Sequence, residues 1–179
     1  MNTDKLSRWA KEIHDNATAH GWHEEKHSQE HWLSLIMCEV AEAIEADRKG
    51  RKFIKCCCVP DYEQYFVGWY NEWVKGTIDE EFADIVIRLL DMTYEIYGQV
   101  AFEVFTNASV YKFDPDKGFA ESAYRFVRCN IGVSVFDIVG SIEYMFAWAE
   151  NLGIDLDQHI EWKMRYNSLR DYKHGGKKY

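Results

Sequence analysis

The fold of this chain is decided by residues 33–50, LSLIMCEVAEAIEADRKG, in which apolar side chains recur every three or four positions. This spacing places them on one face of an α-helix. A second stretch of the same kind, DEEFADIVIRLLDM, covers residues 79–92. Segments of this type pack against each other through their apolar faces, so the sequence predicts an all-α helical bundle.

Composition agrees with a compact helical protein. The 179 residues are 47% hydrophobic and 16% aromatic and include only two prolines, which is enough apolar material for one domain spanning residues 1–179. No apolar run approaches the length of a membrane span, and the polar N-terminus is unlike a signal peptide, so we expect a cytoplasmic protein without a membrane partner. The five cysteines form no CxxC pair and are expected to be reduced thiols: Cys38, Cys56, Cys57, Cys58 and Cys129.

Helical periodicity and its breaks predict about five main helices. We expect them at about residues 3–20, 28–48, 78–97, 133–151 and 156–172. Thr77 and Glu80 have the spacing of a capping box at the start of the third helix, and Gly98 is expected to end it. Residues 114–118, DPDKG, predict a turn. The irregular insertion near residues 51–76 is expected to form a short helix or a hairpin that covers the bundle core.

Two pairs of acids lie within the apolar helical stretches, Glu39-x-x-Glu42 and Glu81-x-x-Asp84. Residues three apart project from the same side of a helix, so two packed helices would bring four carboxylates together. At about 100° per residue, Glu39 points into the apolar face of its helix. Buried carboxylates are costly unless they are paired or bind a metal, and oxygen ligands favour Mg²⁺ or Mn²⁺. The alternative is that these acids pair with Arg88 or a lysine across helices.

A stripe of nitrogen donors is predicted on the last helix. It has the spacing i, i+4, i+7 and i+11 and consists of Lys163, Asn167, Arg170 and His174. Lysine, amide and guanidinium groups suit phosphate oxygens. Residues 161–179 hold six Lys or Arg against two acids, although the whole chain has a net charge of −9. The acidic body argues against duplex nucleic acid, whereas a basic tail suits a small polyphosphate ligand. The alternative is a solvated, basic helix end.

Histidines suggest two other kinds of metal site. Residues 27–31 fit the HxxEH pattern of inverted zinc proteases, and His23, His27 and His31 recur every four residues. Such enzymes need a further acidic ligand from a large second half, which this chain is too small to supply, so we expect a surface histidine stripe. A ferritin-like di-iron site is not favoured, because neither acid pair is the Glu-x-x-His of those bundles.

Three blocks of the chain together resemble the signature blocks of the MazG-like nucleoside triphosphate pyrophosphohydrolases, members of the all-α NTP pyrophosphatase superfamily that also includes the dimeric dUTPases. The blocks are residues 33–50, residues 79–92 and residues 163–179, KMRYNSLRDYKHGGKKY. The resemblance implies a helical bundle of that superfamily, assembled as a homodimer or homotetramer. It also implies Mg²⁺-dependent hydrolysis of a nucleoside or deoxynucleoside triphosphate to the monophosphate and pyrophosphate, as in nucleotide-pool house-cleaning.

The resemblance also implies roles for individual residues. It maps the metal ligands onto the four acids, Glu39, Glu42, Glu81 and Asp84, of which Glu39 or Glu42 would be the catalytic base. It implies phosphate contacts for Lys163, Asn167 and Arg170.

The nucleobase is expected to contact an amide and two aromatic side chains, Asn16, Trp22 and Trp32. The alternative for either tryptophan is core packing. The chain differs from many members of that family at Cys38, where they have a further Glu, and residues 43–80 form a longer gap between the acid pairs. The alternative function is a non-catalytic helical scaffold or partner-binding module with solvated acids.

Overall fold

The computed structural model describes residues 2–54, 58–99, 101, 112–129, 132 and 134–176, and all the regular elements in this part of the chain are helices. The prediction of an all-α fold is therefore confirmed. In chain order, the elements are α1 (Thr3–Ala19), α2 (Gln29–Arg48), α3 (Glu63–Trp73), α4 (Ile78–Tyr97), α5 (Phe119–Cys129), α6 (Val135–Leu152), α7 (Leu156–Ser168) and α8 (Lys173–Gly176).

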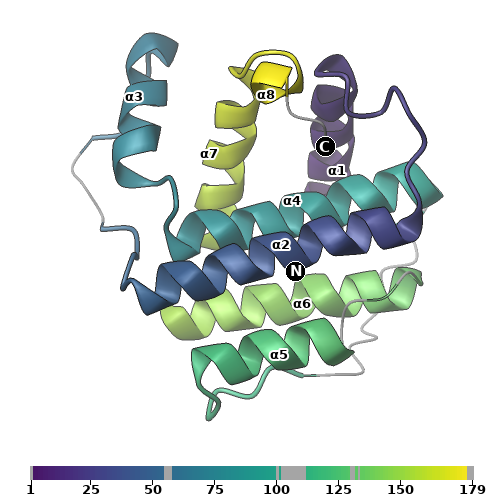
Figure 1. The fold of residues 1–179 in the computed structure, drawn as a ribbon, viewed down its shortest axis with the longest axis vertical. Helices are drawn as coiled ribbons and strands as arrows, with labels where there is room; N and C mark the ends of the chain where they lie inside the picture. Colours follow the sequence, from purple (N-terminus) through teal and green to yellow (C-terminus); the bar gives the residue numbers. More distant parts are fainter. Residues whose placement is uncertain are drawn as a thin grey trace.

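Helix α4 lies at the centre of the bundle and contacts α1, α2, α6 and α7 (Figure 1). Fourteen of its 20 residues are buried, because its neighbours cover nearly all of its surface. Its apolar side chains form one core with residues such as Trp9, Ile36 and Trp148. The acids of α4 are buried along with them, so the surrounding helices must supply hydrogen-bond donors or cations.

The ends of α4 follow the predicted signals only in part. Thr77 is the N-cap and accepts a hydrogen bond from the backbone N–H of Glu80 at 3.2 Å, and Gly98 ends the helix with a φ of 66°. A capping box also predicts that the backbone N–H of Thr77 donates to the Glu80 carboxylate, and this prediction is wrong. The Glu80 carboxylate instead accepts from the backbone N–H of Gly76 and pairs with Lys163 at 2.6 Å. A charge-assisted bond to a buried ammonium is stronger than a bond to a neutral backbone N–H.

Most of the other helices lie close to their predicted positions. The chain breaks after α1 at Gly21, whose φ is 81°, and α2 begins after the N-cap Ser28. The turn at 114–118 is confirmed by a hydrogen bond from the Lys117 N–H to the Asp114 carbonyl at 3.2 Å. The sequence did not predict α5. Two of the residues that it buries, Ser122 and Ala123, are small or polar and give no strong apolar pattern.

The insertion near residues 51–76 forms a helix, α3, rather than a hairpin. It packs on α7, and the two helices share a second core of mostly aromatic side chains: Phe66, Trp69, Tyr70, Val74 and Tyr166. Phe66, Trp69 and Tyr70 are therefore buried in this second core rather than over the bundle core, and Tyr62 and Tyr65 are exposed, so the predicted role of the insertion is correct only in part. Cys38 and Cys58 are free, exposed thiols. Cys56, Cys57 and the side chain of Cys129 lie outside the described residues.

Helix α7 is shorter than predicted and ends at Ser168 instead of near residue 172. The predicted donor stripe therefore does not continue along one helix through Arg170 and His174. The following segment crosses to the end of α1, where the backbone N–H of Lys173 donates to the His20 carbonyl at 3.0 Å. An ion pair of 2.9 Å between Lys173 and Glu24 holds the same crossing.

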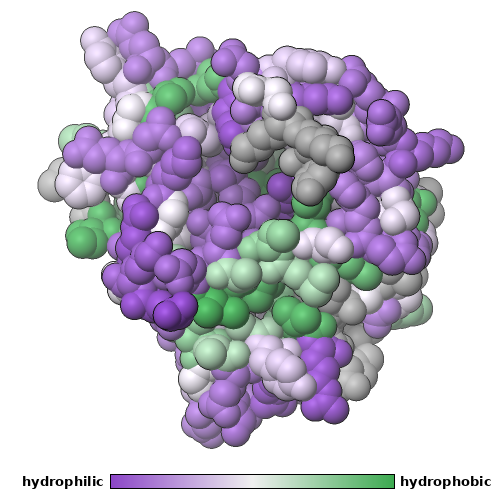
Figure 2. Space-filling model, in the orientation of Figure 1, coloured by the Kyte–Doolittle hydropathy of each residue, from purple (hydrophilic) through white to green (hydrophobic). Residues whose placement is uncertain are grey.

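The surface shown in Figure 2 is largely hydrophilic, and hydrophobic residues gather over α2 and α6. One of these exposed apolar residues is Met37 of α2, which is 43% exposed. Among the helices of the described residues, none combines the length and apolar composition that crossing a bilayer requires.

The buried Thr77 cap gives a test of how α4 is held. Thr77→Ala should lower the free energy of unfolding by about 1–2 kcal/mol, because the first turn of α4 loses its cap inside the protein. Thr77→Ser keeps the hydroxyl and should retain most of this stability. Urea denaturation followed by circular dichroism measures both variants. Equal losses in the two would mean that the methyl group, and not the cap, stabilises this site.

Candidate functional site

A cleft of about 420 Å³ lies between α1, α2, α4 and α7, and we call it the carboxylate cleft. Figure 2 shows the surface hollowed above α2, with hydrophilic residues around the hollow. Every side chain that the sequence predicted for a site lines this cleft: Glu39, Glu42, Glu81, Asp84, Lys163, Asn167, Arg170, His174, Asn16, Trp22 and Trp32. The structure thus brings together residues from both ends of the chain.

Three of the four predicted metal ligands form a compact cluster. Glu39 of α2 and Glu81 and Asp84 of α4 each place one carboxylate oxygen within 4.8 Å of the other two. Glu42 is exposed and borders the cluster, and its charge contributes to raising the pKa of Glu81. The i, i+3 spacing on two packed helices therefore produces the expected convergence of oxygen ligands.

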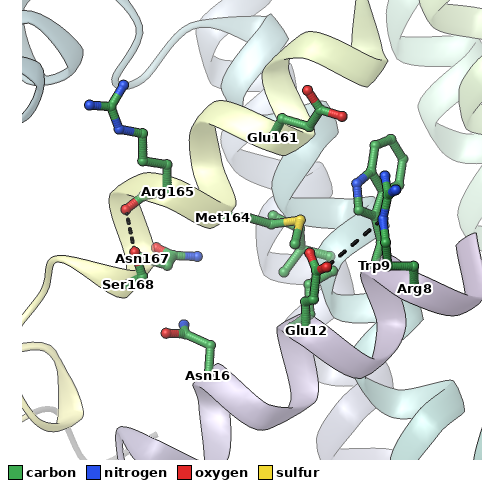
Figure 3. A pocket seen from close by; sticks show the side chains of 11 residues that line it. Arg8, Trp9, Glu12, Asn16, Glu161, Met164, Arg165, Asn167 and Ser168 are labelled. Carbon is green, nitrogen blue, oxygen red and sulfur yellow. Dashed lines mark hydrogen bonds and ion pairs between the residues drawn. The ribbon is translucent and has the colours of Figure 1, made fainter. Parts of the chain in front are cut away.

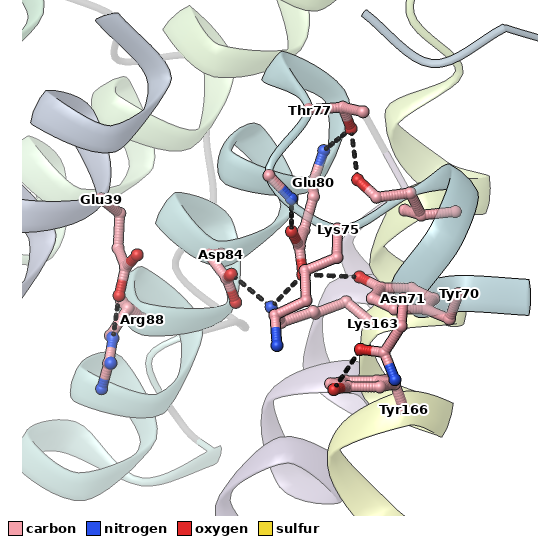
Figure 4. Close-up of polar contacts among 12 residues, drawn as sticks. Glu39, Tyr70, Asn71, Lys75, Thr77, Glu80, Asp84, Arg88, Lys163 and Tyr166 are labelled. Carbon is pink, nitrogen blue, oxygen red and sulfur yellow. Dashed lines mark hydrogen bonds and ion pairs between the residues drawn. The ribbon is translucent and has the colours of Figure 1, made fainter. Parts of the chain in front are cut away.

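Two cations of the protein also enter the cluster (Figure 4). The Lys163 ammonium lies 2.5 Å from Asp84 and 2.6 Å from Glu80, and the Arg88 guanidinium lies 3.0 Å from Glu39. Lys163 is buried, but the two carboxylates outweigh the effect of burial and raise its pKa, so it stays charged. The predicted alternative of interhelical pairs with Arg88 and a lysine is thus present within the same cluster.

Glu81 is the acid of the cluster that pairs with neither cation, although the charge of Lys163 acts to lower its pKa. It is 5% exposed, and its carboxylate makes no hydrogen bond or ion pair with any described residue. Burial, together with the charges of Asp84, Glu80 and Glu42, raises its pKa to about 9. Burial also raises the pKa of Asp84, although Lys163 opposes this. At neutral pH, Glu81 therefore holds a proton that a bound cation would displace.

Two buried polar atoms of cleft residues also lack a partner among the described residues: the indole Nε1 of Trp32 and the amide Oδ1 of Asn167. Trp32 is only 3% exposed. Buried polar groups are nearly always hydrogen-bonded, so an indole donor and an amide acceptor without partners point to a polar ligand or ordered water in the cleft.

The segment after α7 brings Arg170 and His174 to the cleft by a route that helical periodicity did not predict. Because the segment is tied to His20 and Glu24, His174 packs edge-on against Trp22 with ring centroids 5.1 Å apart. Arg170 lines the cleft without an ion pair to any described acid. Its guanidinium is therefore available to an anionic ligand.

A second pocket, of about 480 Å³, opens between α1 and α7 (Figure 3). It shares four wall residues with the carboxylate cleft: Ile13, Asn16, Ile87 and Asn167. In Figure 3, the side chains of Asn16 and Asn167 project from α1 and α7 into the space between the two helices. The two amides therefore stand at the boundary of both cavities.

Sequence reasoning missed two features of this region. Glu80 was assigned only to helix capping, yet it is a main partner of Lys163. The predicted surface histidine stripe is wrong for His23, whose side chain is 7% exposed and bonds Asp91 at 3.0 Å. Both residues precede or begin a helix, so their directions depend on tertiary contacts that periodicity does not encode.

In comparisons with known proteins, no family model, curated protein or solved structure matched this chain. The chemistry of the site therefore follows from its own side chains. The cleft combines a cluster of carboxylates, one of which pairs with no cation, with the cations of Lys163 and Arg88. Its open wall presents amide, guanidinium and aromatic groups.

The proton on Glu81 makes stability depend on pH. Because its pKa is raised above the value in the unfolded chain, the folded state binds the extra proton and loses stability as pH rises from about 4.5 to about 9. Glu81→Gln should remove most of this loss and leave the metal-free protein more stable than the parent at pH 8, since one pKa unit corresponds to about 1.4 kcal/mol.

Thermal unfolding of both proteins across this pH range measures the effect. Glu72→Gln, an isosteric change at an exposed position of α3, serves as the matched control and should change the pH slope little. A parallel fall of stability in the parent and in Glu81→Gln would show that other groups cause the pH dependence.

Proposed function

We propose that this protein is a Mg²⁺-dependent hydrolase that converts a nucleoside or deoxynucleoside triphosphate to its monophosphate and pyrophosphate. The observation that carries the proposal is the convergence of Glu39, Glu81 and Asp84 in a cleft whose other wall presents Arg170 and Asn167. An acidic cluster beside free cationic and amide groups suits a ligand that brings both a divalent cation and phosphates.

The residues of the cluster fit a hard divalent cation. Their donors are all carboxylate oxygens, and Glu81 is buried without a partner, which makes a bound cation favourable there. Mg²⁺ or Mn²⁺ held by Glu39, Glu81 and Asp84, with Glu42 at the rim, would neutralise phosphate charge and acidify a nearby water.

The general base of the proposed reaction is best assigned to Glu42. Glu39 is mostly buried, and one of its carboxylate oxygens, Oε1, is already bound by Arg88 at 3.0 Å. Glu42 is exposed at the edge of the same cluster and has no ion pair with a described residue. A carboxylate in this position can take a proton from a water that attacks a phosphorus in the cleft.

Lys163, Asn167 and Arg170 are assigned to bind the phosphate chain, with His174 beside them. The nucleobase is placed at the other end of the cleft. Trp22 provides an aromatic face and Asn16 an amide, whereas Trp32 is buried in the core and lines the cleft without offering a free face. The Trp32 Nε1–H has no acceptor among the described residues, so a carbonyl of a nucleobase would satisfy it. These features support recognition of a base without specifying which one.

The reaction itself gives the first test. Incubation with a panel of nucleoside triphosphates and Mg²⁺ should yield a monophosphate and intact pyrophosphate, separated by ion-exchange chromatography. Removal of divalent cations with a chelator should abolish turnover, and Asp84→Asn should do the same. Release of a diphosphate and orthophosphate would exclude the proposed bond cleavage. A scaffold protein would hydrolyse none of the panel and would gain no stability from millimolar Mg²⁺.

Arg170 tests the placement of the phosphates. Arg170→Ala should lower kcat/KM by about tenfold or more, because a charge-assisted hydrogen bond is worth about 1.5–3 kcal/mol. Arg48→Ala removes the same charge from an exposed position of α2, where the guanidinium pairs only with Glu45, and should change kcat/KM little. Similar losses in both variants would mean that overall charge matters and that Arg170 has no special position.

A further inference from the structure

A second cluster of metal-ligating side chains lies outside the carboxylate cluster. It combines His14 of α1, His23 of the segment after α1, and two acids one turn apart on α4, Asp91 and Glu95. The side chains of His14, His23 and Asp91 are 18%, 7% and 10% exposed, whereas Glu95 is an exposed residue whose side chain is 33% exposed. The two histidines lie 68 or more residues before the two acids in the sequence, and the packing of α1 on α4 brings the two pairs together.

Asp91 fixes the orientation of both imidazole rings. Its Oδ1 accepts a hydrogen bond from Nδ1 of His14 at 3.1 Å and from Nε2 of His23 at 3.0 Å. A carboxylate oxygen can only accept, so each of these ring nitrogens carries a proton. The other nitrogen of each ring, Nε2 of His14 and Nδ1 of His23, is then an unprotonated lone-pair donor in the neutral imidazole.

Both lone-pair nitrogens face the same carboxylate oxygen. Oε2 of Glu95 lies 3.8 Å from Nε2 of His14 and 3.5 Å from Nδ1 of His23. One ligand atom from each of these three residues lies within 4.8 Å of the other two. Ligands of a tetrahedral zinc ion are about 3.3–3.5 Å apart, so the two distances to Glu95 already lie within about half an ångström of that geometry.

The charges and surroundings of the cluster favour a cation there. In the described part of the chain, neither Asp91 nor Glu95 has a lysine or arginine partner, so two acids face two imidazoles. Trp32 stacks on His23 with ring centroids 5.6 Å apart, and Tyr94 packs against His14 at 4.8 Å. These rings limit solvent on one side, whereas Glu95, 33% exposed, leaves the other side open to it.

We propose that His14, His23 and Glu95 bind a divalent transition-metal ion of the zinc class, with Asp91 as the hydrogen-bond acceptor that orients both imidazoles. Two nitrogen ligands and one carboxylate suit zinc-class ions, whereas the carboxylate cluster offers only oxygen and suits Mg²⁺. A ring nitrogen that donates to a carboxylate while the other binds metal is the usual outer-shell arrangement of histidine sites. Three protein ligands leave the fourth position to water.

Bound metal would join α1, the following segment and α4 directly behind Trp32, a wall residue of the carboxylate cleft. The site is independent of the proposed hydrolysis, because its ligands are not those of the oxygen cluster. Metal binding at this site can therefore be measured without nucleotide. If no metal binds there, the proposed hydrolase activity is unaffected.

Titration of the chelator-treated full-length chain with Co²⁺ alone tests the proposal. One equivalent should produce the intense visible absorption of a four-coordinate site with nitrogen ligands, and Zn²⁺ should displace it. Excess Mg²⁺ and Glu81→Gln, which affect the oxygen cluster, should leave the signal intact. His14→Gln and Glu95→Gln should abolish it, and Asp91→Asn should weaken Co²⁺ binding about 10–100-fold.

The double substitution His27→Gln/His31→Gln removes two stacked imidazoles near the cleft and is the matched control. It should retain the Co²⁺ signal. Should His14→Gln disturb the fold by circular dichroism, Glu95→Gln decides the matter, because Glu95 is the most exposed member. A featureless titration, a signal lost in Glu81→Gln or in the double control, or a signal kept in Glu95→Gln would each overturn the proposal.

Discussion

The structure depends on how negative charge is compensated along α4, a helix that its neighbours cover on nearly all sides. Burying a carboxylate costs several kcal/mol unless a partner compensates it. Asp79 accepts a hydrogen bond from the backbone N–H of Phe53 at 2.9 Å, and Lys163 serves both Glu80 and Asp84. Glu81 has no such partner and keeps a proton instead. If a divalent cation binds as proposed, Glu81 is the described acid of α4 whose charge it would stabilise most.

Position along α4 decides what kind of partner each acid needs. The N-terminal turn of a helix carries partial positive charge, which helps to stabilise Asp79 and the acids after it. Asp91 lies in the C-terminal half, where this help is absent. Burial acts to raise its pKa, but the hydrogen bonds from His14 and His23 lower it overall. The same helix therefore presents a cluster of carboxylate oxygens near its start and a mixed cluster of imidazole nitrogens and carboxylate oxygens near its end. Trp32 lies between the two: it lines the carboxylate cleft and stacks on His23.

The predictable part of this protein is the part that local periodicity controls. The apolar spacing of residues 33–50 and 79–92 placed α2 and α4, and the i, i+3 acids on them converge as expected. The end of α7 and the direction of His23 depend instead on contacts with α1 and α4, which lie far away in sequence. Helix α5 was missed because its buried face is short and partly polar. The chemistry of each residue, and Arg88 as a partner of the acids, could be read from the sequence, but the pairings of Glu80 with Lys163 and of His23 with Asp91 could not.

Lys163 shows how one buried cation can serve both the fold and the proposed reaction. An ammonium has three N–H donors, and two of them meet Glu80 and Asp84. In the proposed reaction, the remaining donor would bind a phosphate oxygen. A divalent cation at Glu81 and Asp84 would also take over the compensation of Asp84, which frees a second donor. A planar guanidinium with fixed donor directions could not redistribute its bonds in this way, so the position suits lysine rather than arginine.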